Sequence, residues 1–195
     1  YPDTGYELPE LRVHEEVVSV DNSTAGTDRD GQVKMFREAA LGLADAAKER
    51  RDNMSEKMAR VVEIINRPEN KDEHFLLWHD LEKEREELCR VIPGCKAVYG
   101  SQNDEEADKV ISDFKDGRLK YLAAKPEMLG EGLNFQYHCH KAIMFIDYRF
   151  NDKFQAIARI YRFMQKHPVD LYLVYAESEG EIYKSFMQKW AQHKE

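Results

Sequence analysis

Two arginines near the C-terminal end of the sequence are spaced to bind an anion. Arg159 and Arg162 lie three residues apart, and Gln155 lies four residues before the first of them. If residues 154–165 form a helix, these three side chains share one face. The apolar side chains of the stretch are then expected to pack inward: Ala156, Ile157, Ile160 and Phe163. Two guanidinium groups on one face form a planar fork that suits a polyphosphate. The plainer alternative is two surface arginines on an amphipathic helix.

A second candidate site follows the predicted strand at residues 119–123. Residues 125–136 contain Gly130 and Gly132, and the lack of a Cβ there lets the backbone approach a phosphate or a ribose. Open α/β sheets bind ligands at the carboxyl ends of their strands, where this stretch is expected to lie. The structural alternative is an ordinary strand-to-helix turn.

Taken in order, these stretches resemble a known family. The pattern Gln-x-x-x-Arg-x-x-Arg-x-x-Gln, followed by the apolar residues 169–175, resembles the last motif of superfamily-2 helicases. The likeness is greatest to the Swi/Snf-like branch, of bacterial or phage type. Residues 125–136 resemble the fifth motif of that family, residues 75–80 the fourth, and residues 100–103 the one that follows it. The four stretches together span residues 74–178.

The resemblance implies that the chain is the C-terminal RecA-like lobe of such a helicase. Arg159 and Arg162 would be its catalytic arginine fingers, largely exposed and pointing toward ATP on a first lobe. Four residues would bind the nucleotide: Gln155, Gly130, Gly132 and Asn134. Ser101 and Lys125 would hold the DNA backbone. Some positions depart from the family pattern: Lys125 replaces a Ser or Thr, Leu129 and Met164 replace glycines, and Ala158 replaces a Gly or Asp.

The function that the resemblance implies is the second motor lobe of an ATP-dependent DNA helicase or translocase. The dipeptide Gly-Lys is absent from the sequence, so there is no Walker A loop, and no predicted strand ends in the Asp-Glu pair of a Walker B motif. We therefore expect ATP and Mg²⁺ to be held mainly by an N-terminal RecA-like lobe. No cofactor is expected on this chain, and no ATP turnover by it alone. The alternatives are a non-enzymatic RecA-like adaptor and the diphosphate-binding half of another α/β enzyme.

Composition narrows the class of protein. The chain has 195 residues, 42% of them hydrophobic, and a net charge of −8. An acidic protein is not expected to coat nucleic acid, so DNA binding by the isolated chain should be weak. No apolar run reaches the length of a membrane span. Three cysteines without a Cys-x-x-Cys pair are typical of a reducing compartment, here the cytoplasm. The His-Cys-His of residues 138–140 alternates in direction, and no metal site is expected.

Hydrophobic patterning predicts a three-layer, RecA-like α/β domain with a central, mostly parallel sheet and an N-terminal helical extension. Five short apolar segments are predicted as strands that alternate with helices: 74–79, 96–99, 119–123, 142–147 and 171–175. We expect residues 1–30 to be a linker and strand from the preceding lobe, residues 31–70 the helical extension, and residues 71–195 the RecA-like domain. Ser55 is predicted as one helix N-cap, and either Asn103 or Ser101 as another.

Overall fold

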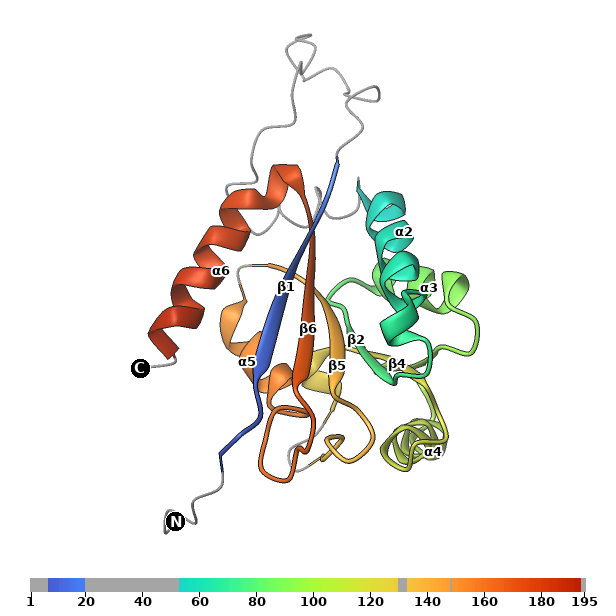
Figure 1. The fold of residues 1–195 in the computed structure, drawn as a ribbon. Coiled ribbons are helices and arrows are strands. Elements are labelled where there is room, and N and C mark those ends of the chain that lie inside the picture. Colours follow the sequence, from blue (N-terminus) through green and yellow to red (C-terminus); the bar gives the residue numbers. More distant parts are fainter. Residues whose placement is uncertain (1–6, 20–52, 130–132, 148, 194–195) are drawn as a thin grey trace, which may run out of the picture.

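The central element is a parallel sheet. The computed structural model describes residues 7–19, 53–129, 133–147 and 149–193. Six strands form one sheet in the order β1-β6-β5-β2-β4-β3, and every neighbouring pair is parallel (Figure 1). The strands are β1 (Leu11–Val18), β2 (Phe75–Trp78), β3 (Lys96–Val98), β4 (Tyr121–Ala124), β5 (Lys141–Phe145) and β6 (Val169–Ala176). The predicted RecA-like α/β class is confirmed.

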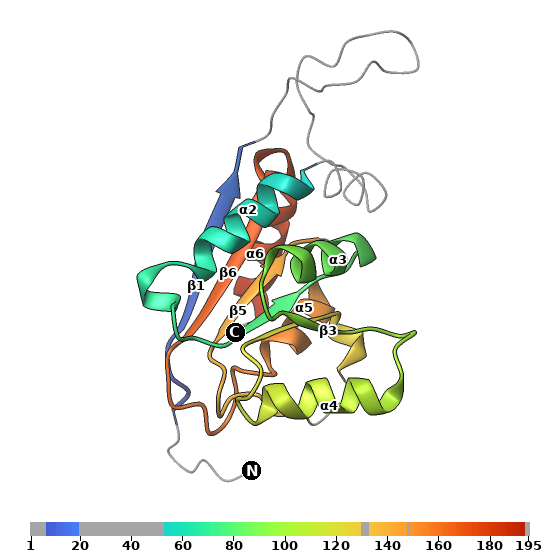
Figure 2. The same cartoon turned by 90° about the vertical axis from the view of Figure 1, so that its right-hand side faces the viewer.

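Helices cover the sheet on both faces. They are α2 (Met54–Ile65), α3 (Glu82–Val91), α4 (Asp104–Lys115), α5 (Phe150–Ile157) and α6 (Gly180–His193), with 3₁₀ turns η2 (Pro68–Asn70), η3 (Pro126–Met128) and η4 (Glu177–Glu179). The helices α2 and α3 pack on one face, and α4, α5 and α6 pack on the other (Figure 2). Within the described ranges, no helix has both the length and the apolar character needed to cross a bilayer.

The direction in which the chain crosses the sheet decides which face each helix covers. From β1 through β2 to β3 the chain moves toward one edge, and from β3 through β4 and β5 to β6 it moves back. Right-handed crossovers therefore place α2 and α3 on one face and α4 and α5 on the other. The chain leaves β2 toward one face but leaves its neighbours β4 and β5 toward the opposite face. Divergence of this kind opens a crevice at the carboxyl ends, where α/β proteins bind ligands.

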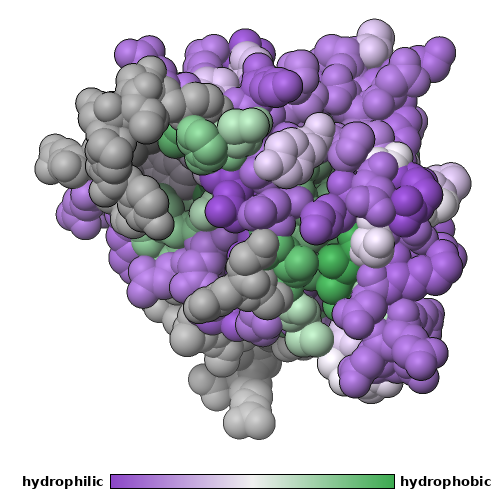
Figure 3. Space-filling view, turned by 90° about the horizontal axis from the view of Figure 1, so that it is seen from below, coloured by the Kyte–Doolittle hydropathy of each residue, from purple (hydrophilic) through white to green (hydrophobic). Residues whose placement is uncertain are grey.

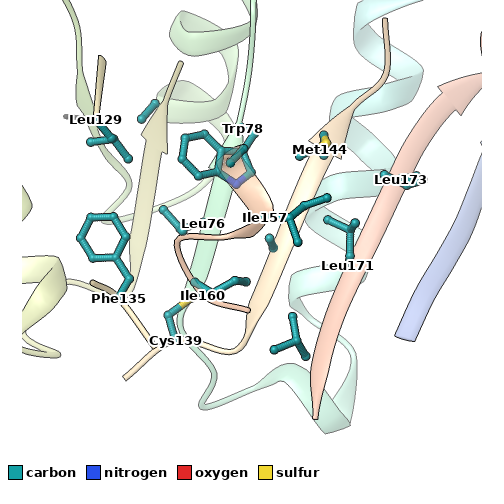
Figure 4. Close-up of a cluster of buried hydrophobic side chains, with 14 of the residues drawn as sticks. Leu76, Trp78, Leu129, Phe135, Cys139, Met144, Ile157, Ile160, Leu171 and Leu173 are labelled. Atoms are coloured by element: carbon teal, nitrogen blue, oxygen red, sulfur yellow. The ribbon is translucent and has the colours of Figure 1, made fainter. Parts of the chain in front are cut away.

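Two apolar clusters fill the space between the sheet and its helices. The larger one lies on the side of α5 and α6, and the other lies beneath α2 and α3. In the larger cluster, Leu76, Met144 and Leu171 of three neighbouring strands meet Ile157 of α5 (Figure 4). Successive side chains of a strand point to opposite faces of the sheet, and both faces are covered here. Each strand is therefore a nearly continuous apolar run in the sequence.

The strand near the N-terminus belongs to the same sheet as the other five. Strand β1 pairs with β6 over its whole length. Glu16 on β1 lies 2.9 Å from Arg60 of α2 and 2.8 Å from Arg67, and buried Lys57 of α2 lies 2.7 Å from Glu179. The expected strand and the later part of the expected helical extension are therefore present, as an edge strand and a covering helix.

The predicted N-caps differ in outcome. The Asn103 cap is confirmed, because its side chain accepts a hydrogen bond from the Glu105 N–H at 2.9 Å. The Ser55 cap is wrong, because α2 already begins at Met54 and the Ser55 hydroxyl donates to Glu56 at 2.9 Å. The first part of the expected helical extension, residues 31–52, lies outside the described residues.

Candidate nucleotide and nucleic-acid sites

The helix that carries Gln155 is shorter than predicted. Helix α5 ends at Ile157, and residues 158–165 continue as turns toward β6. The predicted helix through residue 165 is therefore wrong. Arg159 and Arg162 lie beyond the end of the helix and do not share one of its faces with Gln155.

Tertiary hydrogen bonds replace helical ones at this point. In a continuing helix, the carbonyls of Arg159 and Ile160 would accept from N–H groups four residues later. Instead, the Phe135 N–H donates to the Arg159 carbonyl at 3.2 Å, and Gln165 Nε2 donates to the Ile160 carbonyl at 3.0 Å. Gln165 is buried and also donates to the Cys139 carbonyl at 3.0 Å. Partners from the segment before β5 thus fix the turn.

The apolar side chains of this stretch divide at the end of the helix. Ala156, Ile157 and Ile160 are buried as predicted, and Ile157 and Ile160 point into the larger cluster (Figure 4). Phe163 is the exception, because its side chain is 58% exposed. Its predicted inward position is wrong, since the helical register on which the prediction depends is lost after Ile157.

Exposed apolar side chains gather beside the turn. Gln136 Nε2 donates to the Phe163 carbonyl at 3.2 Å, so the turn and the segment before β5 are neighbours. Tyr137, Phe163 and Met164 are all exposed. Seen from the end of the molecule where the strands begin, the surface shows hydrophobic areas among mainly hydrophilic side chains (Figure 3).

The two arginines differ in their contacts. Arg159 is half-buried, and its Nη2 donates to the Leu129 carbonyl at 3.0 Å. Arg162 is also half-buried, but its side chain makes no hydrogen bond or ion pair with another residue of the described ranges. The expectation that both are largely exposed is wrong, since both are half-buried. The expectation that both are unpaired is wrong for Arg159, because the turn folds back onto the segment that follows β4, but it agrees with Arg162 within the described ranges.

Two of the four predicted nucleotide-binding residues, Asn134 and Gln155, are among the described residues, and both lie near this turn. Asn134 is half-buried, and its Oδ1 is buried with no hydrogen-bond partner among the described residues. It precedes Phe135, which is bonded to the Arg159 carbonyl, so Asn134 and Arg159 come from two segments that are in contact. Gln155 is exposed on α5. Gly130 and Gly132 lie outside the described residues.

Met164 has an unusual backbone conformation. Its φ of 71° is in the left-handed region, which a residue with a Cβ adopts at a cost of about 1 kcal/mol. The helicase motif that the sequence resembles has a glycine at this position. The backbone here therefore keeps a shape that favours glycine although the residue is Met.

The two predicted DNA-binding residues meet in one pocket. The pocket has a volume of about 290 Å³ at the carboxyl ends of β2, β3 and β4, and its walls include His79, Glu82, Ser101 and Lys125. Ser101 is exposed, whereas Lys125 Nζ lies 2.6 Å from the Glu82 carboxylate. Arg85 Nε binds the other carboxylate oxygen at 2.8 Å. Lys125 and Arg85 together lower the pKa of Glu82 to about 2.

His79, which lines this pocket, is a buried polar residue with unusual surroundings. The residue directly follows β2 and is fully buried, yet neither ring nitrogen has a hydrogen-bond partner among the described residues. Burial lowers its pKa to about 4, so the imidazole is neutral at pH 7 and has one donor and one acceptor nitrogen. A buried polar group that lacks a partner is rare in folded proteins and destabilises them.

The crevice on the other side of β2 is closed by charges. Asp80 follows β2, Asp147 follows β5, and both side chains are buried. The fully buried Lys153 of α5 places its Nζ 2.5 Å from Asp80 and 3.8 Å from Asp147. Arg149 reaches both carboxylates at 3.0 Å. Two cations therefore neutralise two carboxylates in a compact cluster. No group of three or more His, Cys, Asp or Glu residues in the described part of the chain is placed to hold a metal ion.

Solved structures share this architecture. The C-terminal part of the Fun30 ATPase domain matches with a TM-score of 0.66 at 11% identity, over 92% of this chain and 90% of that one. The fold is RecA-like. A Dbp5 variant from S. cerevisiae, bound to a Gle1 variant and IP6, matches with a TM-score of 0.57 at 13% identity, over 94% of this chain and 40% of the Dbp5 chain. No family model and no curated protein matches the sequence.

Sequence patterns missed both groups that flank β2. A usable signal was present, because His79 and Asp80 directly follow one apolar strand and Asp147 closely follows another. The carboxyl ends of parallel strands are where sites are built. Glu82 and Lys153 gave no such signal, since charged residues on amphipathic helices are normally exposed.

Proposed function

We propose that the chain is the second motor lobe of an ATP-dependent DNA helicase or translocase, related to the Swi/Snf-like branch. Three kinds of observation support this proposal: the RecA-like fold, the order of the four sequence motifs, and the contact between two of them. In this role the nucleotide and Mg²⁺ are held mainly by a first RecA-like lobe, and the present chain supplies arginines from across the cleft.

The observation that carries the proposal is the contact between the two motifs that would face the nucleotide. Arg159 Nη2 donates to the Leu129 carbonyl at 3.0 Å, and the Phe135 N–H donates to the Arg159 carbonyl at 3.2 Å. Leu129 and Phe135, which lie in the motif after β4, are therefore both in contact with the turn after α5. A lobe that shares a nucleotide with a partner requires such a contact, because phosphate and ribose are contacted together.

Arg162 is the better candidate for the arginine finger. Arg159 is tied to the Leu129 carbonyl, whereas Arg162 has no side-chain partner in the described ranges. A guanidinium without an internal anion is available to stabilise the negative charge that develops on a transferred phosphoryl group. We assign Arg159 mainly to holding the two segments together.

The exposed apolar surface suits contact with the first lobe. Tyr137, Phe163 and Met164 are 56%, 58% and 39% exposed and lie on the two segments joined by the Gln136 hydrogen bond. Exposed apolar side chains that lie next to one another mark interaction surfaces, whereas single exposed apolar side chains are common on any protein. Cover by the first lobe would bury these side chains next to Arg162.

The test is steady-state ATP turnover by the intact two-lobed protein. Arg162→Lys keeps the charge but loses the planar fork, and we expect at least a tenfold loss, about 1.4 kcal/mol of transition-state stabilisation. Arg90→Lys, on the exposed surface of α3, is the matched control and should leave turnover unchanged. DNA affinity without nucleotide should hardly change in either variant.

The proposal makes a second demand on the isolated chain. The 195-residue chain should show no DNA-stimulated ATP turnover, because it has no Walker A loop. Turnover by the purified chain that Arg162→Ala abolishes would contradict the proposal. A loss of DNA binding in Arg162→Lys with turnover intact would place this arginine on the nucleic acid instead.

A further inference from the structure

The pocket between β2, β3 and β4 contains an anion that belongs to the protein itself. Glu82 places one carboxylate oxygen 2.6 Å from Lys125 Nζ and the other 2.8 Å from Arg85 Nε. A backbone phosphate bound by this pocket would also place separate oxygens on two cations. The Glu82 carboxylate therefore has the charge and the partners that a phosphate would have.

The ion pair between Glu82 and Lys125 can separate at little cost in free energy. The Glu82 side chain is 54% exposed, so solvent screens its attraction to Lys125 and little is lost when the pair separates. Arg85 also packs its guanidinium 4.2 Å above the Tyr99 ring, which keeps it beside the pocket. When Glu82 leaves Lys125 it can remain with Arg85, so the carboxylate is not left without a cation.

The lining of the pocket also includes a buried histidine. His79 lines it, is fully buried, and has no hydrogen-bond partner for either ring nitrogen among the described residues. The imidazole is neutral at pH 7 and has one donor and one acceptor nitrogen, but both nitrogens are buried behind the surface of the pocket. His79 therefore contributes an uncharged part of the lining, and the charges that a phosphate would meet come from Lys125 and Arg85.

We propose that Glu82 is an internal substitute for a nucleic-acid phosphate, which occupies Lys125 until a backbone phosphate displaces it. This inference rests on the proposed function, because it makes Ser101 and Lys125 the DNA contact. It adds that the free chain is held in a low-affinity state by one carboxylate. Exchange of Glu82 for a phosphate leaves the charge beside Lys125 balanced before and after binding.

The test compares two glutamates on the same helix. Fluorescence anisotropy of a labelled DNA oligonucleotide at low ionic strength measures affinity for the full 195-residue chain. Glu82→Gln should tighten binding by about threefold or more, the scale of a single charge contact. Glu86→Gln removes the same charge from α3 at an exposed pair with Lys83, and it should change affinity far less. In a Glu82→Gln/Lys125→Ala double variant, the gain should disappear.

The outcomes separate this inference from the proposed function. If Glu82→Gln behaves like Glu86→Gln while Lys125→Ala still weakens binding, the inference is overturned and the DNA contact stands. If Ser101→Ala and Lys125→Ala both leave affinity unchanged, or if no variant binds DNA, the inference is overturned together with the DNA contact. Thermal unfolding of each variant verifies that the fold is retained.

Discussion

Strand β2 has a crevice on each side at its carboxyl end, and the two crevices differ in whether they are filled. On each side the chain diverges toward different faces and leaves a crevice at the carboxyl ends of the strands. Between β2 and β5, the crevice is filled by Lys153, which is fully buried against Asp80 and Asp147. Between β2 and β4 it remains an open pocket, and its lining includes His79, whose ring nitrogens have no hydrogen-bond partner in the part of the chain that the structure describes.

The two crevices differ in whether the charges and polar groups that line them have partners. In the closed crevice every charge has an opposite charge within hydrogen-bonding or ion-pairing distance. In the open pocket a buried polar ring has no hydrogen-bond partner among the described residues, and the ion pair between Lys125 and Glu82 is screened by solvent. Folded proteins retain destabilising polar groups mainly where function requires them. The open pocket therefore has the signature of a binding site.

The largest expected change in unfolding free energy comes from a substitution in the closed crevice. Lys153→Met removes the buried cation and leaves two buried carboxylates to share Arg149, so we expect a loss of about 3 kcal/mol in unfolding free energy. Urea denaturation measures it. Lys184→Met is the control, because that ammonium is 69% exposed beside Glu181, and it should change stability by less than about 0.5 kcal/mol. Equal losses in both variants would show that the cluster is not desolvated.

A gain in stability is expected from the open pocket. His79→Leu replaces an unpartnered buried imidazole with an apolar side chain of similar size, and should raise the unfolding free energy by about 1 kcal/mol at pH 7. A variant that loses stability would indicate that the ring nitrogens are paired in solution.

The pH dependence of stability provides a second measurement on His79. Burial lowers its folded pKa to about 4, below the ordinary histidine value. As the pH falls from about 6.5 to about 4, the unfolded state binds the proton first, so stability decreases through this window and levels off below it. His79→Leu should remove that decrease, while the other histidines act equally in both proteins. Parallel pH profiles would contradict the depressed pKa.

The smallest expected effect concerns the ion pair at the pocket mouth. Lys125→Met should alter the unfolding free energy by no more than about 0.5 kcal/mol, because its partner Glu82 is 54% exposed and keeps Arg85. The comparison is with Lys153→Met under the same denaturant conditions. A loss as large as that of the buried cation would mean that Lys125 has a structural role and is not held in reserve for a ligand.

Most of the fold could be predicted from local patterns. The apolar runs at residues 75–78, 141–145 and 169–176 are strands because a parallel sheet buries both faces of each strand. The order of the strands was not predictable, since it depends on which neighbours the crossovers reach. Helix α5 was overextended because Ile160 continues the helical period, although Phe135 and Gln165 capture the carbonyls that a helix would need.

The candidate site could be predicted only where a single segment carries it. Arg162 was predicted from its spacing, and Ser101 and Lys125 were predicted from the resemblance of their segments to helicase motifs. His79 and Glu82 become pocket residues only because β2 and β4 are neighbours in the sheet. That adjacency joins segments more than forty residues apart, and a pattern within one segment does not contain it.

The pairing of β1 also bears on how the protein avoids self-association. Within the described sheet, β1 is an eight-residue edge strand, and an edge of that length is a template for strand addition by another copy. Its side chains carry charge on both faces: Glu15 meets the Tyr175 hydroxyl, and Glu16 meets Arg60. An incoming strand would have to lie beside these charges. Charged side chains on an edge strand disfavour such pairing, and Glu16, in contact with Arg60 of α2, is one of them.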